Sequence, residues 1–163
     1  MPTVTTPKIV PHLWFAREAV EAATFYASLF PGSRVDRVTP VPADTPSGPA
    51  GSVKVVEFTL AGQRFVALEA GPMDPFNHAV SFLVNCEDQA EVDRLWAALS
   101  EGGTVEMCGW LKDRWGLSWQ IVPVALGEMM RDPDRARAGR VMAAMLKMRK
   151  LDAAALERAR DGR

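Results

Sequence analysis

The order of predicted secondary structure repeats once along this chain of 163 residues, and this repeat constrains the fold more than any other feature. Each copy opens with an apolar strand, continues into an amphipathic helix and closes with three short strands. In the first copy we expect these elements at residues 8–15, 16–30, 33–38, 53–60 and 63–69. In the second copy we expect them at residues 78–84, 86–100, 104–107, 110–112 and 117–123. The sequence therefore predicts an α+β fold of two βαβββ modules that form a cleft.

Proline and glycine mark the boundary between the two modules. The segment Gly71–Asn77 (GPMDPFN) interrupts the strand pattern most strongly. We therefore expect the first module over residues 1–72 and the second over residues 73–124. Residues 125–163 are expected to add C-terminal helices to the same structural domain.

The C-terminal extension is also the most basic part of the chain. Its helices are expected at residues 124–130, 136–148 and 151–159, the second after an Asp132-Pro133-Asp134 start. Between Arg131 and Arg163 the local net charge is +5. A solvated face on docked helices explains this charge most simply, and a site for a phosphate or an acid is the alternative.

The overall composition excludes several classes of protein. Apolar residues make up 48% and the net charge is -1, so no overall field favours nucleic acid as a partner. No apolar run approaches the roughly 20 residues of a membrane helix, and Met1–Pro7 lacks the features of a signal peptide. With two cysteines and no CxxC motif, we expect a cytoplasmic protein without disulfides.

The two histidines of the chain occupy the same place in the repeat. His12 and His78 each lie in the opening strand of a copy, whereas Glu69 and Gln120 lie in the closing strands. Two imidazoles, a carboxylate and an amide oxygen suit a borderline divalent ion such as Zn, Ni, Mn, Co or Fe. That ion would polarise a substrate oxygen or bind water. Glu69 could instead leave the metal and act as a catalytic base.

These residues also have simpler interpretations. A single histidine in an apolar strand is usually a hydrogen-bonded core residue, and an acid near a strand end is usually solvated. Trp14, Trp110 and Trp119 are candidate substrate-binding side chains, although tryptophans more often form core or cavity wall. The matched placement of His12 and His78 favours the ligand interpretation, because the simpler interpretation does not predict it.

Three segments of the second half carry a family resemblance. They read FNHAVSFLVNCEDQAEVDRLWAALSEGG, CGWLKDRWGLSWQIVP and DPDRARAGRVMAAMLKMRKLDAAALERA. Together with PHLWF near the N-terminus, they resemble the PhnB-like branch of the vicinal oxygen chelate superfamily, which includes glyoxalases, bleomycin resistance proteins and dioxygenases. Members of this branch are often named 3-demethylubiquinone-9 3-methyltransferase.

The resemblance implies paired βαβββ modules and a homodimer that binds a small-molecule ligand. In metal-dependent members, the ligand positions correspond here to His12, Glu69, His78 and Gln120. The last of these is often an acid, and here it is an amide. The implied function is a metal-dependent isomerase, lyase or dioxygenase acting on a small oxygenated substrate.

Two alternatives stand beside that function. One is a metal-free module that sequesters a small planar ligand between tryptophans. The other is the methyltransferase of the family name, although the sequence contains no GxGxxG loop that would hold S-adenosylmethionine in the doubly wound manner.

Overall fold

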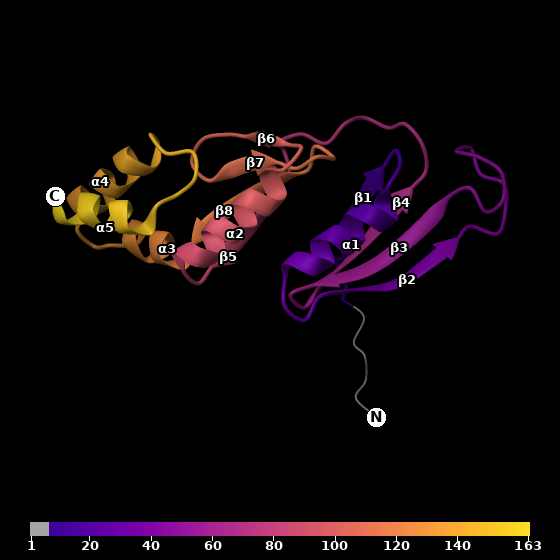
Figure 1. The fold of residues 1–163 in the computed structure, drawn as a ribbon, viewed down its shortest axis with the longest axis horizontal. Coiled ribbons are helices and arrows are strands. Elements are labelled where there is room, and N and C mark those ends of the chain that lie inside the picture. The colour runs from indigo at the N-terminus through magenta and orange to yellow at the C-terminus, as the bar shows by residue number, and fades with distance from the viewer. Residues whose placement is uncertain (1–6) are drawn as a thin grey trace, which may run out of the picture. The chain divides into compact units, whose positions relative to one another are not determined.

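The computed structural model describes residues 7–163. The prediction that Met1–Pro7 is not a signal peptide therefore falls almost entirely outside the described residues. The chain divides into two compact units, the first ending at Asp74 and the second spanning Pro75–Arg163 (Figure 1). Each unit contains one four-stranded mixed sheet. Along the part of the chain that the structure describes, no helix combines the length and the apolar character needed to cross a bilayer.

The first unit is one βαβββ module. Its elements are β1 (His12–Phe15), α1 (Ala19–Leu29), β2 (Arg34–Pro40), β3 (Lys54–Leu60) and β4 (Gln63–Glu69). The sheet has the order β1-β4-β3-β2, with β1 parallel to β4 and the other neighbours antiparallel. The β3–β4 hairpin turns at Ala61-Gly62, where both residues have positive φ (46° and 85°) as a two-residue hairpin turn prefers.

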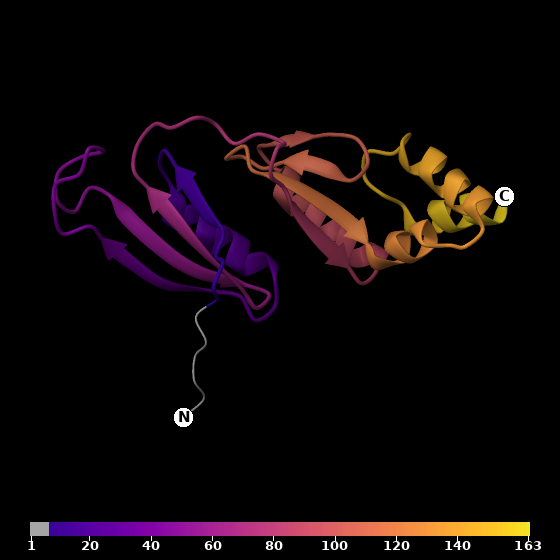
Figure 2. The ribbon, with the colours of Figure 1, turned by 180° about the vertical axis from the view of Figure 1, so that it is seen from behind.

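Helix α1 covers one face of the first sheet, and Figure 2 shows the opposite face. The predicted apolar stripe of this helix is buried, including Ala19, Ala22 and Tyr26. It packs where alternate strand residues, such as Phe58 and Phe65, are also buried. The core of the unit therefore lies between the helix and one side of the sheet.

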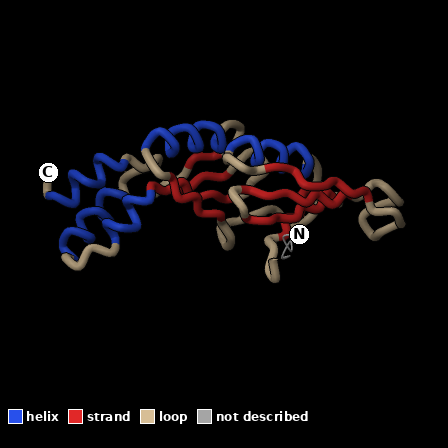
Figure 3. The backbone as a smooth tube through the Cα atoms, turned by 90° about the horizontal axis from the view of Figure 1, so that it is seen from below, coloured by secondary structure: helices blue, strands red, loops and turns tan. Residues whose placement is uncertain are grey.

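The second unit repeats this order and adds helices. Its elements are β5 (Phe82–Cys86), α2 (Gln89–Ser100), β6 (Thr104–Val105), β7 (Trp110–Lys112), β8 (Ser118–Pro123), α3 (Val124–Met130), α4 (Arg135–Met145) and α5 (Ala153–Asp161). The sheet order β5-β8-β7-β6 reproduces that of the first unit. In each unit, a helix layer lies on a strand layer (Figure 3). The predicted α+β fold of two βαβββ modules with C-terminal helices is confirmed.

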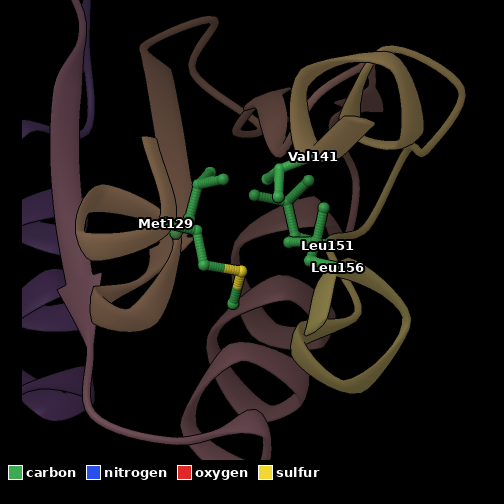
Figure 4. Close-up of a cluster of buried hydrophobic side chains, with 5 residues drawn as sticks. Met129, Val141, Leu151 and Leu156 are labelled. Atoms are coloured by element: carbon green, nitrogen blue, oxygen red, sulfur yellow. The ribbon is translucent and has the colours of Figure 1, made fainter. Parts of the chain in front are cut away.

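The C-terminal helices enclose a core of their own. Five buried residues form it, and Figure 4 shows four of them labelled: Met129, Val141, Leu151 and Leu156. Helix α4 begins after the N-cap Asp134, the last residue of the predicted Asp132-Pro133-Asp134 start, so Pro133 precedes the helix. Helix α5 begins after the N-cap Asp152.

Several element boundaries differ from the prediction. Strand β5 begins at Phe82 rather than His78, because residues 78–80 form a turn and a bend. Helix α2 begins at Gln89 rather than at the predicted residue 86, which lies inside β5, and it is capped by Asp88, whose side chain accepts from the Glu91 N–H. Asp88 lies directly before the first helical turn, where an acceptor reaches the free N–H groups.

Candidate functional site

The strand β1 presents two residues on each side of the first sheet. Leu13 and Phe15 are buried at 7% and 3% exposure, which places them on the face that α1 covers. His12 and Trp14 therefore lie on the opposite face, as their alternation predicts. The Trp14 indole N–H donates to the carbonyl of Gly71 at 2.9 Å, so this side chain is fixed across the end of β4.

Glu69 lies on the helix-covered face. In the parallel pairing of β1 and β4 it stands opposite Phe15. Its Oε2 accepts from the Ala19 N–H at 2.9 Å, and its Oε1 lies 3.0 Å from Lys54 Nζ. Helix α1 needs this acceptor, because its N-cap Glu18 has φ 66° and provides no side-chain cap.

The electrostatics of Glu69 follow from these contacts. Burial alone would raise the pKa of this carboxyl, but the hydrogen bonds from Lys54 and Ala19 outweigh burial and hold its pKa below the usual range. The structure thus gives Glu69 a capping role and does not bring it together with His12, which lies on the other side of the sheet.

In the second unit, His78 lies in the turn before β5 and pairs with an acid. Its Nε2 is 2.6 Å from Oε2 of Glu106, and its ring centroid is 5.9 Å from that of Trp110. The His78 side chain is 48% exposed, so solvent and small molecules can reach it. We did not anticipate Glu106 as a site residue. It follows β6 in a loop, and no spacing in the sequence links it to His78.

Gln120 lies beside Trp110 on the face of the second sheet that α2 leaves uncovered. We call this surface the open face and define it by Leu83, Trp110 and Gln120, which are register neighbours across β5, β8 and β7. The Gln120 side chain donates from Nε2 to Ser81 Oγ at 2.9 Å. Leu83 is 50% exposed, so this face offers apolar contact area.

Trp119 does not share that face. It is 3% exposed, and its indole N–H donates to Asp113 Oδ2 at 2.9 Å. The same carboxylate accepts from the backbone N–H groups of Trp115 and Leu117 at its other oxygen. Trp119 is therefore a core residue of the β7–β8 hairpin, while Trp110 remains the tryptophan beside His78.

The implied metal ligands can be tested against these positions. Among residues 7–163, no group of three or more His, Cys, Asp and Glu side chains forms a metal-binding cluster. Both carboxylate oxygens of Glu69 are engaged by Lys54 and Ala19, on the side of the sheet away from His12. The ligand pair of the first unit therefore does not fit a shared divalent ion.

Comparison with known proteins places the chain in a family. Residues 7–122 match the family described as 3-demethylubiquinone-9 3-methyltransferase. The chain belongs to this family. It is 32% identical to a PhnB protein from Bacillus cereus, with a TM-score of 0.63 over 72% of this chain and 99% of that one. Both matches place it in the PhnB-like branch of the glyoxalase-like superfamily.

A second solved structure shares the fold of this member of the 3-demethylubiquinone-9 3-methyltransferase family. Protein PA1353 from Pseudomonas aeruginosa is 24% identical, with a TM-score of 0.59 over 72% of this chain and 98% of that one. No curated protein matches the chain. Because the family match ends at residue 122, helices α3, α4 and α5 lie beyond it.

Proposed function

We propose that the open face of the second unit binds a small, planar, oxygen-bearing molecule and that the His78–Glu106 pair moves a proton on it. The observation that carries this proposal is the 2.6 Å contact between His78 Nε2 and Glu106 Oε2, next to the ring of Trp110. The reaction class that fits is isomerisation or elimination, in which a base removes a proton from a substrate that bears a carbonyl or hydroxyl group.

The His78–Glu106 contact supports proton transfer because it selects one tautomer of the His78 imidazole. An ionised carboxylate only accepts hydrogen bonds, so Glu106 places the proton of neutral His78 on Nε2. The Nδ1 lone pair then remains available as the base. This is the arrangement in which a carboxylate orients a catalytic imidazole and stabilises its protonated form.

The remaining side chains support binding. The Trp110 ring offers a flat apolar surface on which a planar molecule can stack. The amide of Gln120 lies next to it and can hydrogen-bond a substrate oxygen while it is held by Ser81. Binding pockets commonly combine one aromatic surface with a few placed polar groups in this way.

Titration with a panel of phenols, catechols and α-hydroxyketones tests the proposal. Backbone ¹⁵N resonances of Leu83, Trp110 and Gln120 should shift on binding. Trp110→Leu should abolish the shifts, and Trp96→Leu, a matched change on α2, should retain them. Shifts that centre elsewhere, or that survive Trp110→Leu, would contradict the proposal.

A divalent ion and a homodimer stay predictions of the family resemblance. Elemental analysis of the purified protein tests the ion, and sedimentation velocity tests the dimer. A stoichiometric metal that is lost in the His78→Ala variant would favour the metal-dependent function over the metal-free one.

Methyl transfer is the second candidate, and the match of residues 7–122 to a family with that name favours it. The test is calorimetric titration with S-adenosylmethionine. Heat of binding with a dissociation constant in the micromolar range would support methyl transfer, whereas no heat at high micromolar concentration would remove it.

A further inference from the structure

The segment between α4 and α5 contacts the loop that carries Glu106. We call residues Met148–Leu151 the strap. The Cys108 N–H donates to the Met148 carbonyl, and the Gly109 N–H donates to the Arg149 carbonyl, each at 2.7 Å. Two consecutive amides of the loop thus find their acceptors in the strap.

The two residues that carry these amides have an unusual backbone conformation. Cys108 and Gly109 have φ values of 61° and 82°, so both adopt the left-handed region. This region is unfavourable for a residue with a Cβ, and a cysteine keeps it only where its surroundings hold it there. On the other side, the Ile121 N–H donates to the Gly109 carbonyl at 2.8 Å. The loop is therefore held between β8 and the strap.

The strap is itself anchored to the second sheet's helix. The Gln89 side chain donates from Nε2 to the Leu151 carbonyl at 3.0 Å and accepts from the Ala153 N–H at 2.9 Å. Lys150 Nζ lies 2.6 Å from Asp93 Oδ1, also on α2. Leu151 is fully buried in the C-terminal core.

Leu151 also fills the space beside Gly109. A Cβ built on Gly109 would lie 3.1 Å from Leu151 Cδ1 and 2.8 Å from the Ile121 carbonyl oxygen. The strap and the loop are thus in close contact through side chain as well as backbone. The Glu106 N–H donates to the Trp110 carbonyl at 2.9 Å, so the same loop sets both site residues.

We infer that the strap is a positioning element that holds Glu106 against His78. The strap lies beyond residues 7–122, the part of the chain that matches the family. Its importance for ligand chemistry rests on the proposed function above. The placement of Glu106 itself can be measured without any ligand.

The test is NMR of the full chain with single substitutions. The wild type should show nuclear Overhauser contacts between the His78 ring and the Glu106 methylenes, and slow exchange of the Cys108 and Gly109 amides. Leu151→Ala should lose both signals, and Leu151→Met should restore them. His12→Gln assigns the His78 ring signals, because the chain has only two histidines.

A matched control separates positioning from general destabilisation. Leu156→Ala removes the same atoms from the same fully buried core, on α5 and outside the strap. It should keep the His78–Glu106 contacts. If Leu151→Ala does not fold, Gln89→Ala replaces it, since this change removes the Gln89 hydrogen bonds to Leu151 and Ala153 with a smaller loss of packing. The inference is overturned if the strap variant keeps the contacts, or if Leu156→Ala loses them equally.

The two proposals can fail separately. Loss of the contacts in the strap variant, together with no ligand binding by the wild type, would support the positioning role and refute the proposed function. Ligand binding by the wild type, together with undiminished His78–Glu106 contacts in the strap variant, would support the proposed function and refute the positioning role.

Discussion

At the scale of single residues, Glu69 shows how one carboxylate can be used for stability. Its two oxygens join the N-terminus of α1 to Lys54 on β3. A negative charge at a helix N-terminus is favourable, and here the acceptor also replaces a missing N-cap side chain. The chain therefore uses the acid that ends β4 to fix the start of its first helix.

We predict that Glu69→Gln lowers stability by about 1 kcal/mol at pH 7, the usual size of a capping contribution. The pKa of Glu69 is lowered in the folded state, so its stabilisation is complete above the unfolded value of about 4.3 and is lost as the pH falls through the folded value. Urea denaturation should show a larger difference between the two proteins at pH 7 than at pH 3.

The control for Glu69 is Glu101→Gln, which removes an exposed acid at the end of α2. This variant should match the wild type at both pH values. An equal loss at pH 3 and pH 7 for Glu69→Gln would show that its charge contributes nothing.

The two cysteines are predicted to differ in reactivity. Burial raises the pKa of Cys86 to about 12, so almost no thiolate forms near neutral pH. Cys108 is partly exposed in its loop. Iodoacetamide at pH 8 should label Cys108 and leave Cys86 unmodified, as peptide mass spectrometry can measure. Both should react in denaturant, and labelling of native Cys86 at the rate of Cys108 would contradict the prediction.

At the scale of elements, the β7–β8 hairpin is held together by one buried carboxylate. Asp113 accepts from two backbone N–H groups of its own turn and from the Trp119 indole. Asp113→Ala would leave these three donors without their acceptor, and unsatisfied buried groups are costly. We expect a loss of about 2–4 kcal/mol, measured by urea denaturation. Asp74→Ala, at an exposed position, should change stability little.

The periodicity of the sequence predicted most elements correctly. The amphipathic helix predicted at residues 86–100 buries Val92, Leu95 and Leu99, whereas Trp96, expected on the same stripe, is only half-buried. The last helix begins close to its predicted residue 151. These signals are local, because spacing along one element decides them.

Local sequence patterns could not predict which face of each sheet a helix covers, nor which residues meet through the loops. Alternation groups Glu69 with Phe65 and Ala67 but does not say which face carries α1, and only the pairing with Phe15 decides this. The His78–Glu106 contact joins residues 28 positions apart through a loop with two left-handed residues. No periodicity encodes such a contact.

At the scale of the whole molecule, the C-terminal helices belong to the second unit. Their core, the strap and the β5–β8 sheet all lie within residues 75–163. We predict that this segment, expressed alone, unfolds cooperatively and retains slow exchange of the Cys108 and Gly109 amides. Circular dichroism melting and hydrogen exchange check this, and exchange of both amides at the rate of free peptide would refute it.

The first unit contains a single tryptophan, Trp14, whose indole N–H donates to the carbonyl of Gly71, shortly after the end of β4. The other four tryptophans all fall in the second unit. Replacing those four with phenylalanine would leave Trp14 as the remaining tryptophan, and its side chain joins the beginning and the end of the first module. Its tryptophan fluorescence would then report the unfolding of the first module alone, because the second unit would contain no tryptophan.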